Sequence, residues 1–63
     1  MKLIRHYEIR TRHSGKLVGK LPPDADTRAE FAWVAALSPR VPLALYEINA
    51  LGDVRDITPR EKE

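Results

Sequence analysis

The alternation of apolar and polar positions predicts a β-strand from Lys2 to Arg12. The apolar face consists of Leu3, Tyr7 and Ile9, and the polar face consists of His6, Glu8, Arg10 and Arg12. Such a pattern is typical of a strand with one buried side and one solvated side. Ile4 and Arg5 interrupt the alternation near its start.

A second alternating segment, Lys16 to Leu21, follows a short turn sequence, His13-Ser14-Gly15. Gly15 can take the positive φ that a tight turn requires. The two segments therefore predict a β-hairpin. In this hairpin Leu17, Gly19 and Leu21 would share the apolar face, whereas Lys16, Val18 and Lys20 would share the other.

Pro22 and Pro23 end the hairpin because neither can donate a backbone hydrogen bond to a neighbouring strand. A helix is predicted from Thr27 to Leu37, and Asp24, Asp26 and Thr27 are its candidate N-caps. An apolar stripe at helical spacing consists of Ala29, Ala32, Trp33, Ala36 and Leu37, with Phe31 and Val34 beside it. Trp33 is expected to anchor this stripe in the core. Pro39 ends the helix by Ser38.

The remainder predicts a second hairpin, with an extended segment over residues 40–50, a turn at 50–53 and a short strand over 54–57. The fold expected is therefore a ββαββ domain of the α+β class. Its four-stranded antiparallel sheet would have the order 2-1-3-4, with the helix packed on one face. Residues 1–63 are expected to form a single domain, in which 58–63 are a polar, frayed C-terminal tail with at most one capped turn.

One helix can cover only one face of such a sheet, and the third strand is apolar on both faces. A partly apolar open face is therefore expected, which suggests a homodimer or a docking site for another protein. Its candidate residues are Ile4, Val18, Leu43, Leu45 and Tyr46. The alternative is that these are isolated exposed apolar residues of the ordinary kind.

Composition narrows the class of protein. A chain of 63 residues has a small core and a small stability margin, and without cysteine it has no disulfide or thiolate metal cluster to reinforce it. No apolar run is long enough to span a bilayer. We therefore expect a soluble, cytoplasmic protein without a membrane partner, a cofactor or an evident small-molecule substrate.

Charge is distributed unevenly along the chain. The first twenty residues hold six basic side chains against Glu8 alone, a net charge of +5, whereas the remainder is −3 and the total is +2. The candidate binding residues are Arg10, Arg12, His13, Lys16 and Lys20. A basic two-stranded ribbon suits the phosphates of nucleic acid. The same charges would also suit an acidic protein surface, as in a phage-type inhibitor or anti-CRISPR-like protein, or serve only as a solvated face.

Catalysis is not expected. His6, Glu8 and Arg10 lie along one face of the first strand and offer a base, an acid and a phosphate clamp, which leaves a small ribonuclease as a minor alternative. Metal binding through His6 with Glu8 or His13 lacks further ligands at suitable spacing. A non-catalytic binding module is therefore the expected function.

About half of the chain resembles the arm-binding domain of phage integrases. The resemblance is carried by Tyr7-Glu8-Ile9-Arg10, by Ser14-Gly15-Lys16 and by Ala29-Glu30-Phe31-Ala32-Trp33. It implies a sheet-and-helix domain that reads DNA. The family has three strands before its helix, whereas two are predicted here.

Overall fold

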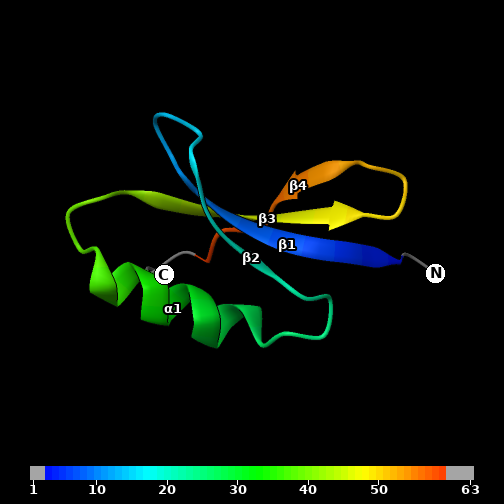
Figure 1. The fold of residues 1–63 in the computed structure, drawn as a ribbon, viewed down its shortest axis with the longest axis horizontal. Helices are drawn as coiled ribbons and strands as arrows, with labels where there is room; N and C mark the ends of the chain where they lie inside the picture. The colour runs from blue at the N-terminus through cyan, green and yellow to red at the C-terminus, as the bar shows by residue number, and fades with distance from the viewer. Residues whose placement is uncertain (1–2, 60–63) are drawn as a thin grey trace.

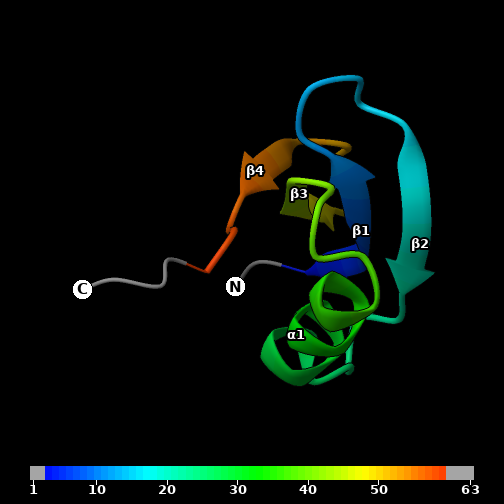
Figure 2. The ribbon, with the colours of Figure 1, turned by 90° about the vertical axis from the view of Figure 1, so that its left-hand side faces the viewer.

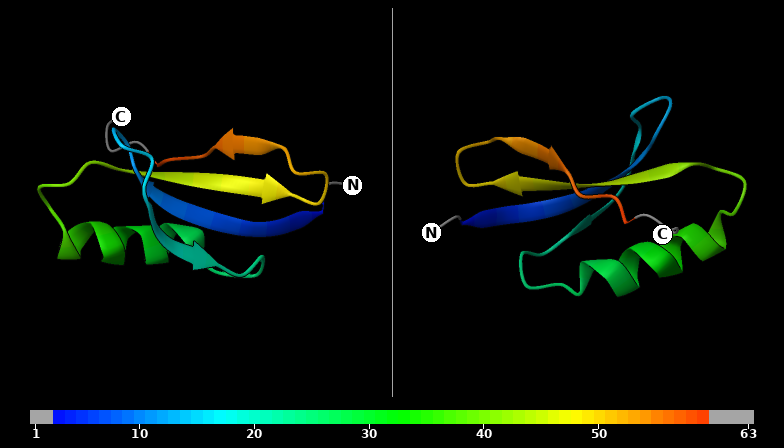
Figure 3. Two further views of the ribbon diagram at one scale, coloured as in Figure 1. Left: turned by 45° about the horizontal axis from the view of Figure 1, so that its top comes forward. Right: turned by 180° about the vertical axis from the view of Figure 1, so that it is seen from behind.

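Within residues 3–59, four strands form one antiparallel sheet in the order β2-β1-β3-β4, and a single helix lies along one face of it (Figures 1 and 3). The computed structural model describes residues 3–59. The elements are β1 (Ile4–Thr11), β2 (Leu17–Leu21), α1 (Thr27–Leu37), β3 (Leu43–Asn49) and β4 (Val54–Asp56). The predicted α+β class, strand order and helix bounds are confirmed.

Both hairpin turns depend on a glycine with positive φ, Gly15 at +73° and Gly52 at +90°. In the first turn the Gly15 amide donates to the Thr11 carbonyl at 2.9 Å, and the Thr11 amide donates to the Lys16 carbonyl at 2.9 Å. In the second turn the Asn49 side-chain oxygen accepts from the amides of Leu51 and Asp53 at 2.9 and 3.0 Å. These bonds satisfy the backbone where the strands reverse.

The N-cap of helix α1 is Asp26, one of the three candidates that the sequence predicted. The Asp26 carboxylate accepts from the Ala29 amide at 3.3 Å, and the Asp26 carbonyl accepts from the Glu30 amide at 3.0 Å. An acceptor at this position satisfies an amide that the first helical turn leaves without an intrahelical partner.

The core lies between the sheet and α1. Its buried residues are Ile9, Leu43 and Leu45, which are 1%, 8% and 1% exposed. Partly buried side chains pack around them: Tyr7, Leu21, Phe31, Val34, Ala35 and Ile57. The core is thus small, as the chain length predicts.

The expectation that Trp33 anchors the helix in the core is wrong. Trp33 is 63% exposed and Leu37 is 64% exposed, whereas Phe31, Val34 and Ala35 face the sheet. Each helical residue turns by about 100°, so Trp33 lies about 200° from Phe31, on the far side. The narrower stripe at positions 31, 34 and 35 is the one that seats on the sheet.

A bulge in the first hairpin changes the predicted faces of β2. Ile9 pairs with Gly19 and Arg10 pairs with Leu17, so β2 carries one extra residue at Val18. The alternation is reversed beyond the bulge. Leu17 therefore lies beside Arg10, and Lys16 does not share a face with Lys20, contrary to the sequence prediction.

The open face of the sheet is less apolar than expected. Leu43 and Leu45 face α1 and belong to the core, which removes them from the candidate interface. The residues opposite the polar positions of β1 are Ala44, Tyr46 and Ile48. Ala44 is fully buried and Ile48 is 7% exposed, so the polar side chains of β1 and their neighbours already cover much of this face.

The segment after β4 is attached to β3. The Ile57 amide donates to the Leu45 carbonyl at 2.9 Å, and the Leu45 amide donates to the Thr58 hydroxyl oxygen at 3.0 Å. Thr58 and Pro59 are half-buried. The rest of the predicted tail, residues 60–63, lies outside the described residues.

Candidate functional site

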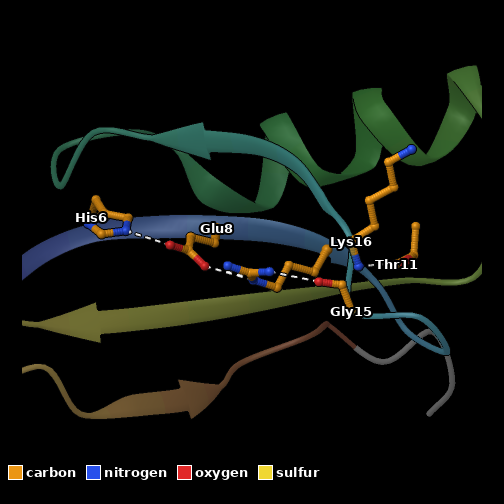
Figure 4. Close-up of polar contacts among 6 residues, drawn as sticks. His6, Glu8, Thr11, Gly15 and Lys16 are labelled. Atoms are coloured by element: carbon orange, nitrogen blue, oxygen red, sulfur yellow. Dashed lines mark hydrogen bonds and ion pairs between the residues drawn. The ribbon is translucent and has the colours of Figure 1, made fainter.

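The open face of β1 carries a row of three linked polar side chains, His6, Glu8 and Arg10. Figure 4 labels the first two of them, His6 and Glu8. The His6 Nε2 atom lies 2.9 Å from Glu8 Oε2, and Arg10 Nε donates to Glu8 Oε1 at 2.8 Å. The period-two spacing along an extended strand places all three on the same face. The predicted row is therefore brought together, and each oxygen of Glu8 is engaged by a neighbour.

The Glu8 carboxylate is held in its ionised form. Its side chain is 14% exposed, yet its pKa lies below the ordinary value of 4.5. The hydrogen bond with His6 is the largest cause of the lowered pKa, and Arg10 adds to it through a hydrogen bond and its charge, while desolvation opposes both. Glu8 thus orients its two neighbours at neutral pH.

Arg10 connects this row to the tip of the hairpin. Its Nη1 atom donates to the Gly15 carbonyl at 2.7 Å, while its Nε atom is held by Glu8. The side chain is 36% exposed. Two hydrogen bonds therefore fix the position of the Arg10 guanidinium group. Its positive charge is partly compensated by Glu8, which distinguishes Arg10 from the other cations of the hairpin.

The remaining candidate binding residues are exposed and lie on different sides of the hairpin: Arg12, His13, Lys16 and Lys20. Lys20 on β2 lies opposite Glu8 on β1 in the strand register, so both residues are on the open face of the sheet. Lys16 points away from the His6, Glu8 and Arg10 row (Figure 4). Arg12 and His13 lie in the turn that connects β1 and β2. Arg12 Nη2 donates to the Leu43 carbonyl over a long distance of 3.4 Å. We call Arg12, His13, Lys16 and Lys20, together with Arg10, the basic hairpin.

The tip of the basic hairpin projects from the body of the protein. In two views at right angles, the turn between β1 and β2 lies at the top of the molecule and the helix α1 at the bottom, on opposite sides of it (Figures 1 and 2). A partner that reaches the tip from the side away from α1 therefore does not meet the helix.

The candidate protein interface is not assembled as the sequence predicted. Val18 is 46% exposed at the bulge, whereas Ile4 and Tyr46 are only half-buried strand residues and the two leucines lie in the core. A more exposed apolar surface lies on the outer side of α1, around Trp33 and Leu37. Sequence reasoning missed it because it assigned these residues to the core. The available signal was a helix that is apolar on nearly all sides.

No group of three or more metal-binding side chains occurs within residues 3–59. Within the same residues, no helix has the length and apolar character that crossing a membrane requires. The chain matches no family model, no characterised protein and no solved structure. The two strands before α1 also differ from the three of the integrase arm-binding family, so that resemblance carries no argument here.

Proposed function

We propose that the protein is a binding module for double-stranded nucleic acid, and for duplex DNA in particular, that places its basic hairpin in a groove. The observation that carries the proposal is the distribution of cations on both faces and at the tip of a projecting two-stranded ribbon. A ribbon in a groove has a phosphate backbone on each side, so cations on both faces each find a phosphate.

The groove dimensions favour DNA over duplex RNA. The major groove of B-DNA, about 12 Å wide, admits a two-stranded β-ribbon, whereas the major groove of A-form RNA is deep and narrow. Glu8 is the one acidic residue between positions 3 and 21, and it is engaged by His6 and Arg10. The hairpin therefore presents little negative charge to a phosphate backbone.

The test is a titration of a fluorescein-labelled DNA duplex, followed by fluorescence anisotropy at increasing salt. Three to four phosphate contacts predict a slope of log K against log salt of about −3, and nonspecific dissociation constants of about 1–100 μM. A duplex RNA of the same length is expected to bind more weakly.

Two matched pairs of substitutions distinguish binding through the hairpin cations from binding that depends only on the net charge of the protein. Arg12→Ala with Lys16→Ala should reduce the slope by about two, since each cation neutralises one phosphate. Arg28→Ala with Arg40→Ala removes the same charge from exposed positions outside the hairpin and should leave the slope nearly unchanged. Equal effects of the two pairs, or no binding at low salt, would contradict the proposal.

A further inference from the structure

The guanidinium group of Arg10 is fixed at two of its nitrogen atoms by separate parts of the basic hairpin. Nε donates to Glu8 Oε1 at 2.8 Å, and Nη1 donates to the Gly15 carbonyl at 2.7 Å. Glu8 belongs to β1, whereas Gly15 belongs to the turn. A side chain that is already held in place loses less conformational freedom when it binds a ligand.

Part of this guanidinium group remains available to a ligand. A guanidinium group carries N–H donors on all of its nitrogen atoms, yet within residues 3–59 no hydrogen bond or ion pair joins Nη2 of Arg10 to an acceptor. The residues opposite Arg10 on the neighbouring strands are Leu17 and Ala44, whose side chains have no polar atom. The Arg10 side chain is 36% exposed. Nη2 and the second hydrogen of Nη1 can therefore pair with an acceptor from outside the chain.

We propose that Arg10 recognises guanine in the major groove of DNA, and that Glu8 and Gly15 position it for this contact. The inference rests on the proposed binding of duplex DNA by the basic hairpin. Guanine presents two acceptors in the major groove, N7 and O6, which match a pair of guanidinium N–H groups. Adenine and cytosine each present an amino donor there, and thymine presents a single acceptor, so guanine is the base that suits two parallel donors.

The carboxylate beside Arg10 favours a base over a phosphate as its ligand. Phosphate binding depends mainly on charge, whereas base recognition depends on the direction of hydrogen bonds. Glu8 repels a phosphate group, but it also orients the guanidinium group through Nε. Arg12 and Lys16 form no ion pair within residues 3–59 and are exposed, so they are better suited to the phosphates.

The test compares three DNA duplexes by fluorescence anisotropy at low salt. The duplexes share one mixed sequence and carry guanine, 7-deazaguanine or hypoxanthine at every guanine position. 7-Deazaguanine lacks the N7 acceptor, whereas hypoxanthine keeps N7 and O6 and lacks only the amino group in the minor groove. The 7-deazaguanine duplex should bind about threefold more weakly than the guanine duplex, and the hypoxanthine duplex should bind as well as the guanine duplex.

Substitution of two arginines separates recognition of guanine from general attraction to DNA. Arg10→Lys keeps the positive charge but replaces the planar set of donors with a single ammonium group, so it should abolish the difference between the guanine and 7-deazaguanine duplexes. Arg12→Lys makes the same change at the neighbouring hairpin cation and should preserve the difference. Circular dichroism establishes that both variants fold.

Glu8→Gln tests the positioning of Arg10. Glutamine has one side-chain oxygen, for which His6 and Arg10 would compete, whereas each oxygen of Glu8 serves one of them. The difference between the guanine and 7-deazaguanine duplexes should therefore shrink, while the affinity for both duplexes rises because a negative charge is removed. A general loss of structure would instead weaken both. A full difference in Glu8→Gln would overturn the positioning role of Glu8.

Failure of this inference can be distinguished from failure of the proposed function. Equal binding of the guanine and 7-deazaguanine duplexes by the unmodified protein would overturn the recognition of guanine and leave the proposed binding of DNA intact. A difference that persists in Arg10→Lys would overturn the assignment to Arg10. Absence of binding to all three duplexes would overturn both proposals.

Discussion

Phe31 and Trp33 lie on opposite sides of α1: Phe31 packs against the core, and Trp33, two residues later, is 63% exposed. The larger side chain thus contributes less to the fold of the single chain. Helical geometry requires this separation, because residues two apart cannot share a helix face.

Truncation of these two aromatic residues should therefore affect stability unequally. Phe31→Ala should lower the free energy of unfolding by about 2 kcal/mol, less than for a fully buried phenylalanine. Trp33→Ala should change it by less than about 0.5 kcal/mol. The measurement is urea unfolding followed by far-ultraviolet circular dichroism. A larger loss for Trp33→Ala would mean that Trp33 supports the fold.

The elements of this fold were predictable because their signals are local. The strand alternation, Gly15 in the turn, Pro22 with Pro23, and Asp26 among the candidate caps fix where each element begins and ends. The strand order agrees with the prediction that the strand after the helix pairs with the first strand, so that the two hairpins form one antiparallel sheet.

The orientation of the elements was less predictable. A helix with apolar residues on both sides can pack either side against the sheet. Whether Phe31 or Trp33 is buried depends on how α1 is oriented on the sheet. The bulge at Val18 carries no clear sequence signal, yet it decides that Lys16 lies apart from Lys20. For these reasons the composition of the basic hairpin was predicted, while its arrangement and the exposed face of α1 were not.

Acid should remove the contribution of Glu8 to stability. Its pKa is lowered in the folded protein, so folding favours the carboxylate, and this stabilisation is present above the pKa of the unfolded chain. It is lost as pH falls through the lower pKa of the folded state. Glu8→Gln should therefore destabilise the protein at pH 7 and have little effect at about pH 2 to 3. Urea unfolding at both values tests this, and an equal destabilisation at the two values would contradict it.

The turn glycine should be sensitive to substitution in a way that the strand glycine is not. Gly15 has a φ of +73°, so a side chain there strains the backbone, and Gly15→Ala should lower stability by about 1 kcal/mol. Gly19 has no positive φ, and a Cβ atom added there meets nothing within 4 Å. Gly19→Ala should consequently be neutral or slightly stabilising. Thermal unfolding of the two variants provides the comparison, and equal losses would exclude backbone strain as the cause.

Thr58 should stabilise the sheet through its hydroxyl group. The Leu45 amide donates to the Thr58 hydroxyl oxygen, and Leu45 is almost fully buried. Thr58→Val keeps the shape and removes this acceptor, so it should cost about 1–2 kcal/mol. Thr58→Ser keeps the hydroxyl group and serves as the control. Amide hydrogen exchange at Leu45 should be faster in the valine variant only; unchanged exchange would show that another group satisfies the amide.

Glu8→Gln should also separate folding from nucleic-acid binding, because its effects on the two have opposite signs. The substitution removes the acidic residue that compensates Arg10, so the basic hairpin gains one net positive charge. Binding to a DNA duplex at low salt should tighten by about threefold while stability at pH 7 falls. Glu30→Gln makes the same charge change on α1 and should alter DNA binding far less. If both variants tighten binding equally, the attraction depends on total charge and the hairpin is not the binding surface.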